Sequence, residues 1–182
     1  MVERRLFVLD VLPTGWPGER SFNREPVAIS LGYDEFKLLE VVLKPGLPVA
    51  PGETLGVVPG EGFSPAVEHV RRRLSFQELT TAARSELSHA IESVVAENPE
   101  RFLRFMNEAH PINVRFHMLQ LLPGVGRKTM EAIVRERQKA PFRSFADMEE
   151  RLKLKDPQKL IVARIEQELS GEEEKYRLFV PH

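Results

Sequence analysis

The stretch LLPGVGRKT, residues 121–129, decides how the C-terminal part of this sequence is interpreted. Gly124 and Gly126 lack a Cβ atom, so they adopt backbone conformations closed to other residues and let a partner approach closely. Two cations, Arg127 and Lys128, follow them directly. The stretch is therefore either a tight turn between two helices or a place where backbone N–H groups meet an anion.

Apolar residues at helical spacing lie on both sides of this turn and along most of the chain after residue 75. The letters SFQE at Ser75 form a capping-box pattern, and Asn98–Pro99 is typical of a helix start. The pattern predicts helices at 75–98, 99–110, 113–122, 127–140, 145–152 and 157–169, and a short strand at 176–180. The stretch 121–129 thus joins two predicted helices and opens the second of them.

The first third of the chain carries short apolar or β-branched runs separated by turns rich in Gly and Pro. These runs lie at 5–11, 27–31, 36–43 and 54–58. Several short strands joined by such turns indicate a small barrel or a curled sheet. The sequence therefore predicts an α+β protein with a small β-barrel domain at 1–62, followed by an all-helical domain at 63–182.

Composition narrows the class of protein. The chain of 182 residues is 42% hydrophobic and 29% charged, which is ordinary for a globular protein. It has no Cys, which excludes disulfides, cysteine-bound metals and a cysteine nucleophile. No apolar run approaches the ~20 residues that span a bilayer, and the N-terminal run is too short for a signal peptide. We expect a cytoplasmic protein.

Positive charge is concentrated around the glycine turn. The formal net charge of the chain is −1, which does not suggest a strongly basic nucleic-acid binder. Residues 101–143, however, carry nine Lys and Arg against three Asp and Glu, while the rest of the chain is net negative. Local clustering governs the attraction of anions more than net charge does. Arg135 extends the cluster along the predicted helix.

Residues 112–152 resemble the helix-hairpin-helix family. They carry the LPGVG hairpin, an apolar Ile133 four residues before an arginine, and the pattern F-x-S-F-x-D-M. The resemblance implies that the amides of Val125, Gly126 and Arg127 contact a nucleic-acid backbone without reading sequence, helped by Arg127 and Lys128. Two departures are Met130, where the family often has a small residue, and the absence of glycine from LKLKDPQKL at 152–160. One phosphate site is therefore implied.

The whole layout is similar to an uncharacterised family, domain of unknown function 655. The similarity rests on LPVAPGETLGVVPGEG at 47–62, RRRLSFQELT at 71–80 and the glycine hairpin. It implies an OB-like barrel followed by a helix-hairpin-helix. It also implies a role in binding nucleic acid, RNA in particular.

Other candidate contacts leave alternatives open. Arg71 and Arg72, in a run of three arginines, track phosphates if the segment is an irregular linker, or form a solvated charge run at the domain junction. Three consecutive arginines on a helix point in different directions. Trp16 and Phe22 either stack on bases or cover one end of the barrel.

No signature of catalysis or of a metal site is present. The sequence has no phosphate-binding loop of the Walker type, no G-x-S-x-G and no H-E-x-x-H, and its five histidines lack ligand spacing. We therefore expect no enzyme, no metal and no cofactor. The predicted function is a non-catalytic protein that binds the backbone of RNA or DNA with little dependence on sequence. The alternative is a module that docks a protein in a ribosome-linked or repair complex.

Overall fold

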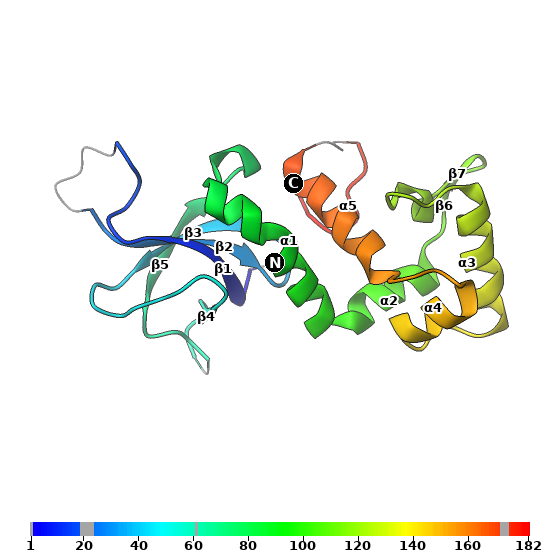
Figure 1. Ribbon diagram of the computed structural model, residues 1–182, viewed down its shortest axis with the longest axis horizontal. Helices are drawn as coiled ribbons and strands as arrows, with labels where there is room; N and C mark the ends of the chain where they lie inside the picture. The colour runs from blue at the N-terminus through cyan, green and yellow to red at the C-terminus, as the bar shows by residue number, and fades with distance from the viewer. Residues whose placement is uncertain (1, 19–23, 61, 172–174) are drawn as a thin grey trace. The chain divides into compact units, whose positions relative to one another are not determined.

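The computed structural model describes residues 2–18, 24–60, 62–171 and 175–182 (Figure 1). The chain divides into two compact units, and the division falls within two helices. Unit 1 comprises residues 1–91 and 168–182, and unit 2 comprises residues 92–167. No helix in the described ranges combines the length and the hydropathy needed to cross a bilayer.

Unit 1 is built on one curled, antiparallel sheet of five strands in the order β4-β1-β2-β3-β5 (Figure 1). The strands are β1 Arg5–Leu12, β2 Val27–Gly32, β3 Leu38–Leu43, β4 Thr54–Gly56 and β5 Val67–Arg73. Every residue of β2 and β3 is buried, which explains their nearly continuous apolar sequences. The predicted α+β class and the curled sheet in the first part of the chain are confirmed.

Strand β5 was not predicted. It pairs with β3 at the edge of the sheet, so the sheet continues past the predicted boundary at residue 62. Only its first residue, Val67, is buried, and the other six are exposed. A charged edge strand with one apolar anchor lacks the alternation that marks a strand in sequence. Both the helix and the irregular linker considered for Arg71–Arg73 are therefore wrong.

Most of the predicted helices are present. The helical elements are the 3₁₀ turn η1 Phe76–Glu78, α1 Thr81–Glu97, α2 Pro99–Glu108, the 3₁₀ turn η2 Met118–Leu121, α3 Arg127–Lys139, α4 Phe145–Leu152 and α5 Gln158–Ser170. The capping box at Ser75 forms, but it opens η1 rather than the long helix. Thr80 Oγ1 then accepts the Ala83 N–H at 3.1 Å, and α1 begins at Thr81.

The predicted helix at 113–122 is wrong. In its place a two-stranded hairpin, β6 Pro111–Asn113 and β7 Phe116–His117, leads into η2. The Asn113 carboxamide oxygen accepts the Arg115 N–H at 2.9 Å, which closes the turn between the strands. Asparagine competes with helical hydrogen bonds in this way, so local turn chemistry outweighs the apolar spacing here.

The predicted strand at 176–180 is also wrong, because a buried carboxylate takes its backbone donors. Glu168 is 1% exposed and accepts the N–H groups of Leu178, Phe179 and Val180 at 2.6, 2.9 and 2.8 Å. These donors are then not available for a ladder with another strand. Glu168 thus fixes the backbone of the tail, and Arg73 adds a hydrogen bond to the Pro181 carbonyl.

Candidate nucleic-acid interface

The glycine turn in unit 2 is held from inside by Val125. Gly124 has φ +84°, a left-handed conformation that favours glycine. The Val125 N–H donates to the Leu122 carbonyl at 3.0 Å, and the Val125 side chain is 6% exposed. The turn is therefore anchored by one buried side chain and one backbone hydrogen bond. The Val125 N–H that the resemblance offered to a ligand is already engaged within the turn.

The open donors of the turn lie one residue further on. Gly126 is the N-cap of α3, and its carbonyl accepts the first helical hydrogen bond, from the Met130 N–H at 3.0 Å. In the described part of the chain, the N–H groups from Gly126 to Thr129 have no acceptor. A serine or aspartate N-cap supplies such an acceptor, and glycine supplies none. The sequence analysis did not name Thr129 as a contact. With Gly126 as the N-cap, however, the N–H of Thr129 is the fourth of the open amides.

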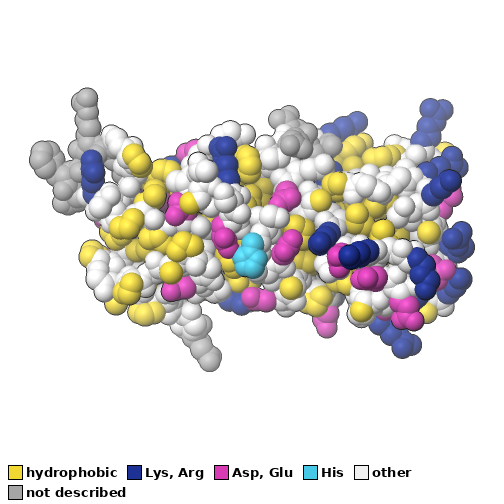
Figure 2. Space-filling view, in the orientation of Figure 1, with side chains coloured by type: hydrophobic (Ala, Val, Ile, Leu, Met, Phe, Trp, Pro, Cys, Tyr) yellow, Lys and Arg dark blue, Asp and Glu magenta, His cyan; other side chains and the backbone are white. Residues whose placement is uncertain are grey.

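The cations at the start of α3 are exposed. Arg127 is 83% exposed, and its Nε lies 3.0 Å from the Glu131 carboxylate one turn later. Lys128 has no acidic partner among the residues described, and no acidic residue lies in the first turn of α3. Arg135 lies seven residues after Lys128, two turns along the same face. Figure 2 shows Lys and Arg side chains gathered over the end of unit 2 that carries α3.

Arg137, which belongs to the same basic cluster in sequence, has a structural role. Its guanidinium donates to the carbonyls of Met106 at 3.0 Å and Ala109 at 2.6 Å. These contacts satisfy the C-terminal end of α2, where carbonyls lack helical donors. Burial lowers the pKa of Arg137 from its ordinary value, and it remains charged. The positive surface of α3 is therefore smaller than the sequence count suggests.

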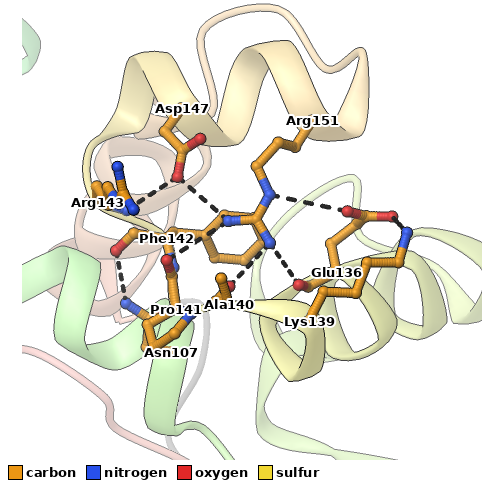
Figure 3. A network of polar contacts seen from close by, with 9 residues as sticks. All are labelled: Asn107, Glu136, Lys139, Ala140, Pro141, Phe142, Arg143, Asp147 and Arg151. Atoms are coloured by element: carbon orange, nitrogen blue, oxygen red, sulfur yellow. Dashed lines mark hydrogen bonds and ion pairs between the residues drawn. The ribbon is translucent and has the colours of Figure 1, made fainter.

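Arg151 fixes the other end of α3 (Figure 3). It extends from α4 and donates to the carbonyls of Glu136, Ala140 at 2.8 Å and Pro141 at 3.4 Å. It also donates to the Asp147 carboxylate at 3.2 Å. One side chain thus satisfies the last carbonyls of α3 and links that helix to α4.

The pattern F-x-S-F-x-D-M forms the junction that receives Arg151. The N–H and carbonyl of Phe142 exchange hydrogen bonds with the Asn107 side chain at 2.8 and 3.0 Å (Figure 3). Ser144 caps α4 by accepting the Asp147 N–H at 2.9 Å, and the Asp147 carboxylate accepts the Arg143 N–H at 3.0 Å. The pattern is thereby explained by helix capping and packing.

Arg71 and Arg72 both face a buried carboxylate in unit 1. Glu40 on β3 is 1% exposed and lies 2.8 Å from Arg71 and 2.9 Å from Arg72. A bulge between β3 and β5 lets these adjacent residues reach the same side chain. Each arginine also pairs with a second acid, Glu25 or Glu78. Their charge is therefore offset before any ligand arrives.

The remaining sequence candidates are distributed over unit 1. Trp16 is half-buried in the turn after β1, and Phe22 lies outside the described residues. No group of three or more His, Asp or Glu side chains in the described ranges is arranged to hold a metal ion. The polar contacts described above therefore make the turn at 124–129 the strongest candidate for a binding site.

A buried histidine precedes the turn and supports it. His117 Nδ1 accepts the Leu119 N–H at 3.1 Å and so caps η2. Burial, with the nearby charges of Arg137 and His110, lowers the pKa of His117 below its ordinary value of 6.5. Below pH 6.5 the unfolded chain therefore binds a proton that the folded chain resists. The stabilising contribution of His117 is complete above pH 6.5 and declines as the pH falls.

Acidification from about pH 7.5 to about pH 5 is expected to lower the free energy of unfolding more in the wild type than in a His117→Asn variant. Asparagine keeps an oxygen that caps η2 and does not titrate. Urea unfolding at each pH measures the difference. The exposed His69→Asn variant serves as the control and should follow the wild type. Parallel curves for wild type and His117→Asn would show that this histidine does not couple to folding.

Comparison with known proteins places this geometry in a family. A family model described as a protein of unknown function, DUF655, matches residues 2–181. The chain belongs to the DUF655 family. This confirms the resemblance of the whole layout to that family.

Two relatives span nearly the whole chain. The uncharacterised protein MJ0038 of Methanocaldococcus jannaschii is 40% identical over 179 residues, which are 98% of this chain and 80% of that protein. The crystal structure of Af1531 from Archaeoglobus fulgidus, also of DUF655, has a TM-score of 0.89 and 38% identity. The structural match covers 98% of this chain and 100% of the Af1531 chain. Neither relative's name states an activity, so these comparisons establish the family and the fold.

Proposed function

We propose that this protein binds the phosphate backbone of RNA or DNA at the turn from Gly124 to Thr129, without catalysis and largely without reading sequence. The observation that carries the proposal is the glycine N-cap of α3, which leaves the amides from Gly126 to Thr129 without an acceptor in the described chain. In this proposal the turn and α3 act as the second half of a helix-hairpin-helix, and the 3₁₀ turn η2 stands where that motif has its first helix.

Steric access supports the proposal. A Cβ at Gly126 would meet no atom within 4 Å, and its φ of −89° is open to any residue. Glycine is therefore not required there by the fold, in contrast to Gly124 with its positive φ. The space beside Gly126 is open and holds no side-chain acceptor that would compete with a ligand for the helix amides. A phosphate oxygen fits that space and accepts from N–H groups aligned with the helix dipole.

Electrostatics supports it as well. Arg127 and Lys128 lie in the first turn of α3, where cations oppose the helix dipole and reduce stability slightly. An anion at the N-cap removes this unfavourable interaction. Arg135 lies further along the face of Lys128 and adds attraction over a greater length of backbone. Amides and cations of this kind contact phosphates, which carry no direct sequence information.

The decisive experiment replaces Gly126 by aspartate. The carboxylate is expected to accept the open amides and repel phosphate, so affinity for a labelled oligonucleotide should fall about ten- to hundredfold. Stability should stay the same or rise, because aspartate is a good N-cap. Fluorescence anisotropy with RNA and DNA probes at two salt concentrations measures affinity, and thermal unfolding measures stability.

Gly126→Ala is the matched control. It adds a Cβ into open space, supplies no acceptor and should retain binding within about threefold. Lys128→Ala should reduce the slope of log affinity against log salt by about 1. If Gly126→Asp binds as wild type does, the phosphate is held elsewhere. If no probe binds at low salt, the proposal fails and the docking of a protein partner becomes the better hypothesis.

A further inference from the structure

Unit 2 contains a groove beside the turn that the phosphate contact does not use. It has a volume of about 550 Å³ and lies between the β6–β7 hairpin and the first turns of α3. Arg127, the first residue of α3, forms part of its wall, so the groove adjoins the open amides. Its volume is within the usual range for small-molecule sites of roughly 300–1,000 Å³.

Two carboxamides line the groove with their oxygens already engaged. Asn113 Oδ1 accepts the Arg115 N–H at 2.9 Å, and Gln120 Oε1 accepts the His117 N–H at 2.8 Å. A backbone N–H can only donate, so the atom that it contacts in each carboxamide is the oxygen. The other terminal atom of each side chain is therefore the NH₂ group. Neither NH₂ group has an acceptor within the described ranges. The groove therefore offers oriented donors to a ligand that carries acceptors.

Apolar and cationic groups complete the lining. Val114 at the tip of the β6–β7 hairpin is 105% exposed, and Met130 on α3 is half-buried. Arg115 is exposed, and its side chain has no acidic partner in the portion of the chain that the structure describes. The groove thus combines apolar surface, two donor groups and two arginines, Arg115 and Arg127, and the carboxylate of Glu131, which also lies on the lining, is paired with Arg127 at 3.0 Å.

We infer that this groove holds the base of an unpaired nucleotide whose phosphate lies on the amides from Gly126 to Thr129. The inference rests on the proposed function and makes single-stranded RNA or DNA the ligand. A nucleobase has a planar apolar face together with carbonyl and ring-nitrogen acceptors at its edge, which match the donors of Asn113 and Gln120. In a duplex the base is stacked and paired, so it enters a groove only after it leaves the stack.

The arginines of the groove fit the chemistry of a nucleotide, and Arg115 has no acidic partner in the described residues. Guanidinium groups stack on bases and attract phosphates, and Arg115 and Arg127 lie on the lining of the groove. Arg127 belongs both to the groove lining and to the run of open amides, so the two sites adjoin. The base contacts are carboxamide NH₂ groups and apolar surface, which every base can satisfy. The expected preference is therefore for the presence of a base and not for its identity.

The test compares a short single strand with the same strand carrying abasic residues, which keeps the phosphates and removes the bases. Wild-type protein is expected to bind the base-containing strand about tenfold more tightly. In an Asn113→Ser/Val114→Ser variant this preference should disappear while affinity for the abasic strand stays unchanged. Serine retains an oxygen for the Arg115 N–H, so the turn is kept. Val58→Ser, at a 40% exposed position in unit 1, is the matched control.

The outcomes separate the two hypotheses. Equal binding of both strands by wild type would overturn the groove inference and leave the phosphate contact standing. A base preference that survives in the double variant would also overturn it, because the base would then lie elsewhere. Absence of binding to either strand would overturn both hypotheses and leave the groove to a ligand of another class, such as a peptide.

Discussion

Removal of both arginines that face Glu40 is expected to lower the free energy of unfolding by about 3–5 kcal/mol. In an Arg71→Met/Arg72→Met variant the carboxylate of Glu40, 1% exposed, would stay buried without its two charged donors at 2.8 and 2.9 Å. A buried charge without a partner is among the most destabilising features of a folded protein. Chemical denaturation measures the loss.

Two further variants test the cause of that loss. Arg73→Met removes the third arginine of the run, whose guanidinium donates to the Pro181 carbonyl at 3.0 Å and to no other acceptor in the described residues, and should cost about 1 kcal/mol. Addition of Glu40→Leu to the double variant should restore part of the stability, since an apolar replacement of the whole cluster needs no charge partner. If the double variant is as stable as the wild type, the ion pairs with Glu40 do not stabilise the fold. Arg71 and Arg72 would then be available to contact phosphates, as the sequence analysis proposed.

The strands and helices with a strong apolar period could be predicted from the sequence. Strands β2 and β3 are buried at every position, and their apolar runs indicated them clearly. Helix α3 could be placed within a residue of its true ends because a glycine turn precedes it and Pro141 follows it. In these segments local preference and tertiary packing agree, so the sequence pattern is sufficient.

Two of the features that were missed, strand β5 and the irregular tail, depend on contacts between residues that are apart in sequence. Strand β5 is a strand because β3 pairs with it, although only Val67 of its seven residues is buried. The tail lacks a strand because the carboxylate of Glu168 takes its N–H donors. No periodicity records such pairings, since the partners are separated in sequence.

The residues of the candidate site that are neighbours in sequence could be predicted, and those that depend on tertiary contacts could not. The glycines and the first cations of α3 are adjacent in sequence, and the open amides follow from the N-cap at Gly126. The engagement of Arg137 with α2 and of Arg71 with Glu40 depends on tertiary contacts. The groove beside the β6–β7 hairpin could not be predicted, because the sequence pattern favoured a helix at 113–122 in place of the hairpin. The residue that could have indicated the hairpin is Asn113, because asparagine favours turns over helices.

Replacement of Arg151 by methionine is expected to lower the free energy of unfolding by about 2–4 kcal/mol. Methionine preserves much of the aliphatic packing against the Phe142 ring, over which the guanidinium lies at 4.5 Å. It removes the donors to the carbonyls of Glu136, Ala140 and Pro141 and to Asp147 (Figure 3). The end of α3 would then have unsatisfied carbonyls, and α4 would lose its polar link to that helix. Urea denaturation measures the loss.

Arg143→Met is the matched control, because Arg143 joins the same network mainly through its backbone N–H, and its side-chain charge adds the smallest of the effects that lower the pKa of Asp147. Its N–H donates to Asp147 at 3.0 Å, and this bond survives any side chain except proline. Its side chain is exposed and has no bond within the described ranges, so the substitution should cost less than about 0.5 kcal/mol. Hydrogen exchange adds a local readout. Arg151→Met should speed exchange of the Ala140 amide, which donates to the Glu136 carbonyl at the end of α3. Equal effects of the two variants would mean that Arg151 acts through net charge, not through the carbonyls it caps.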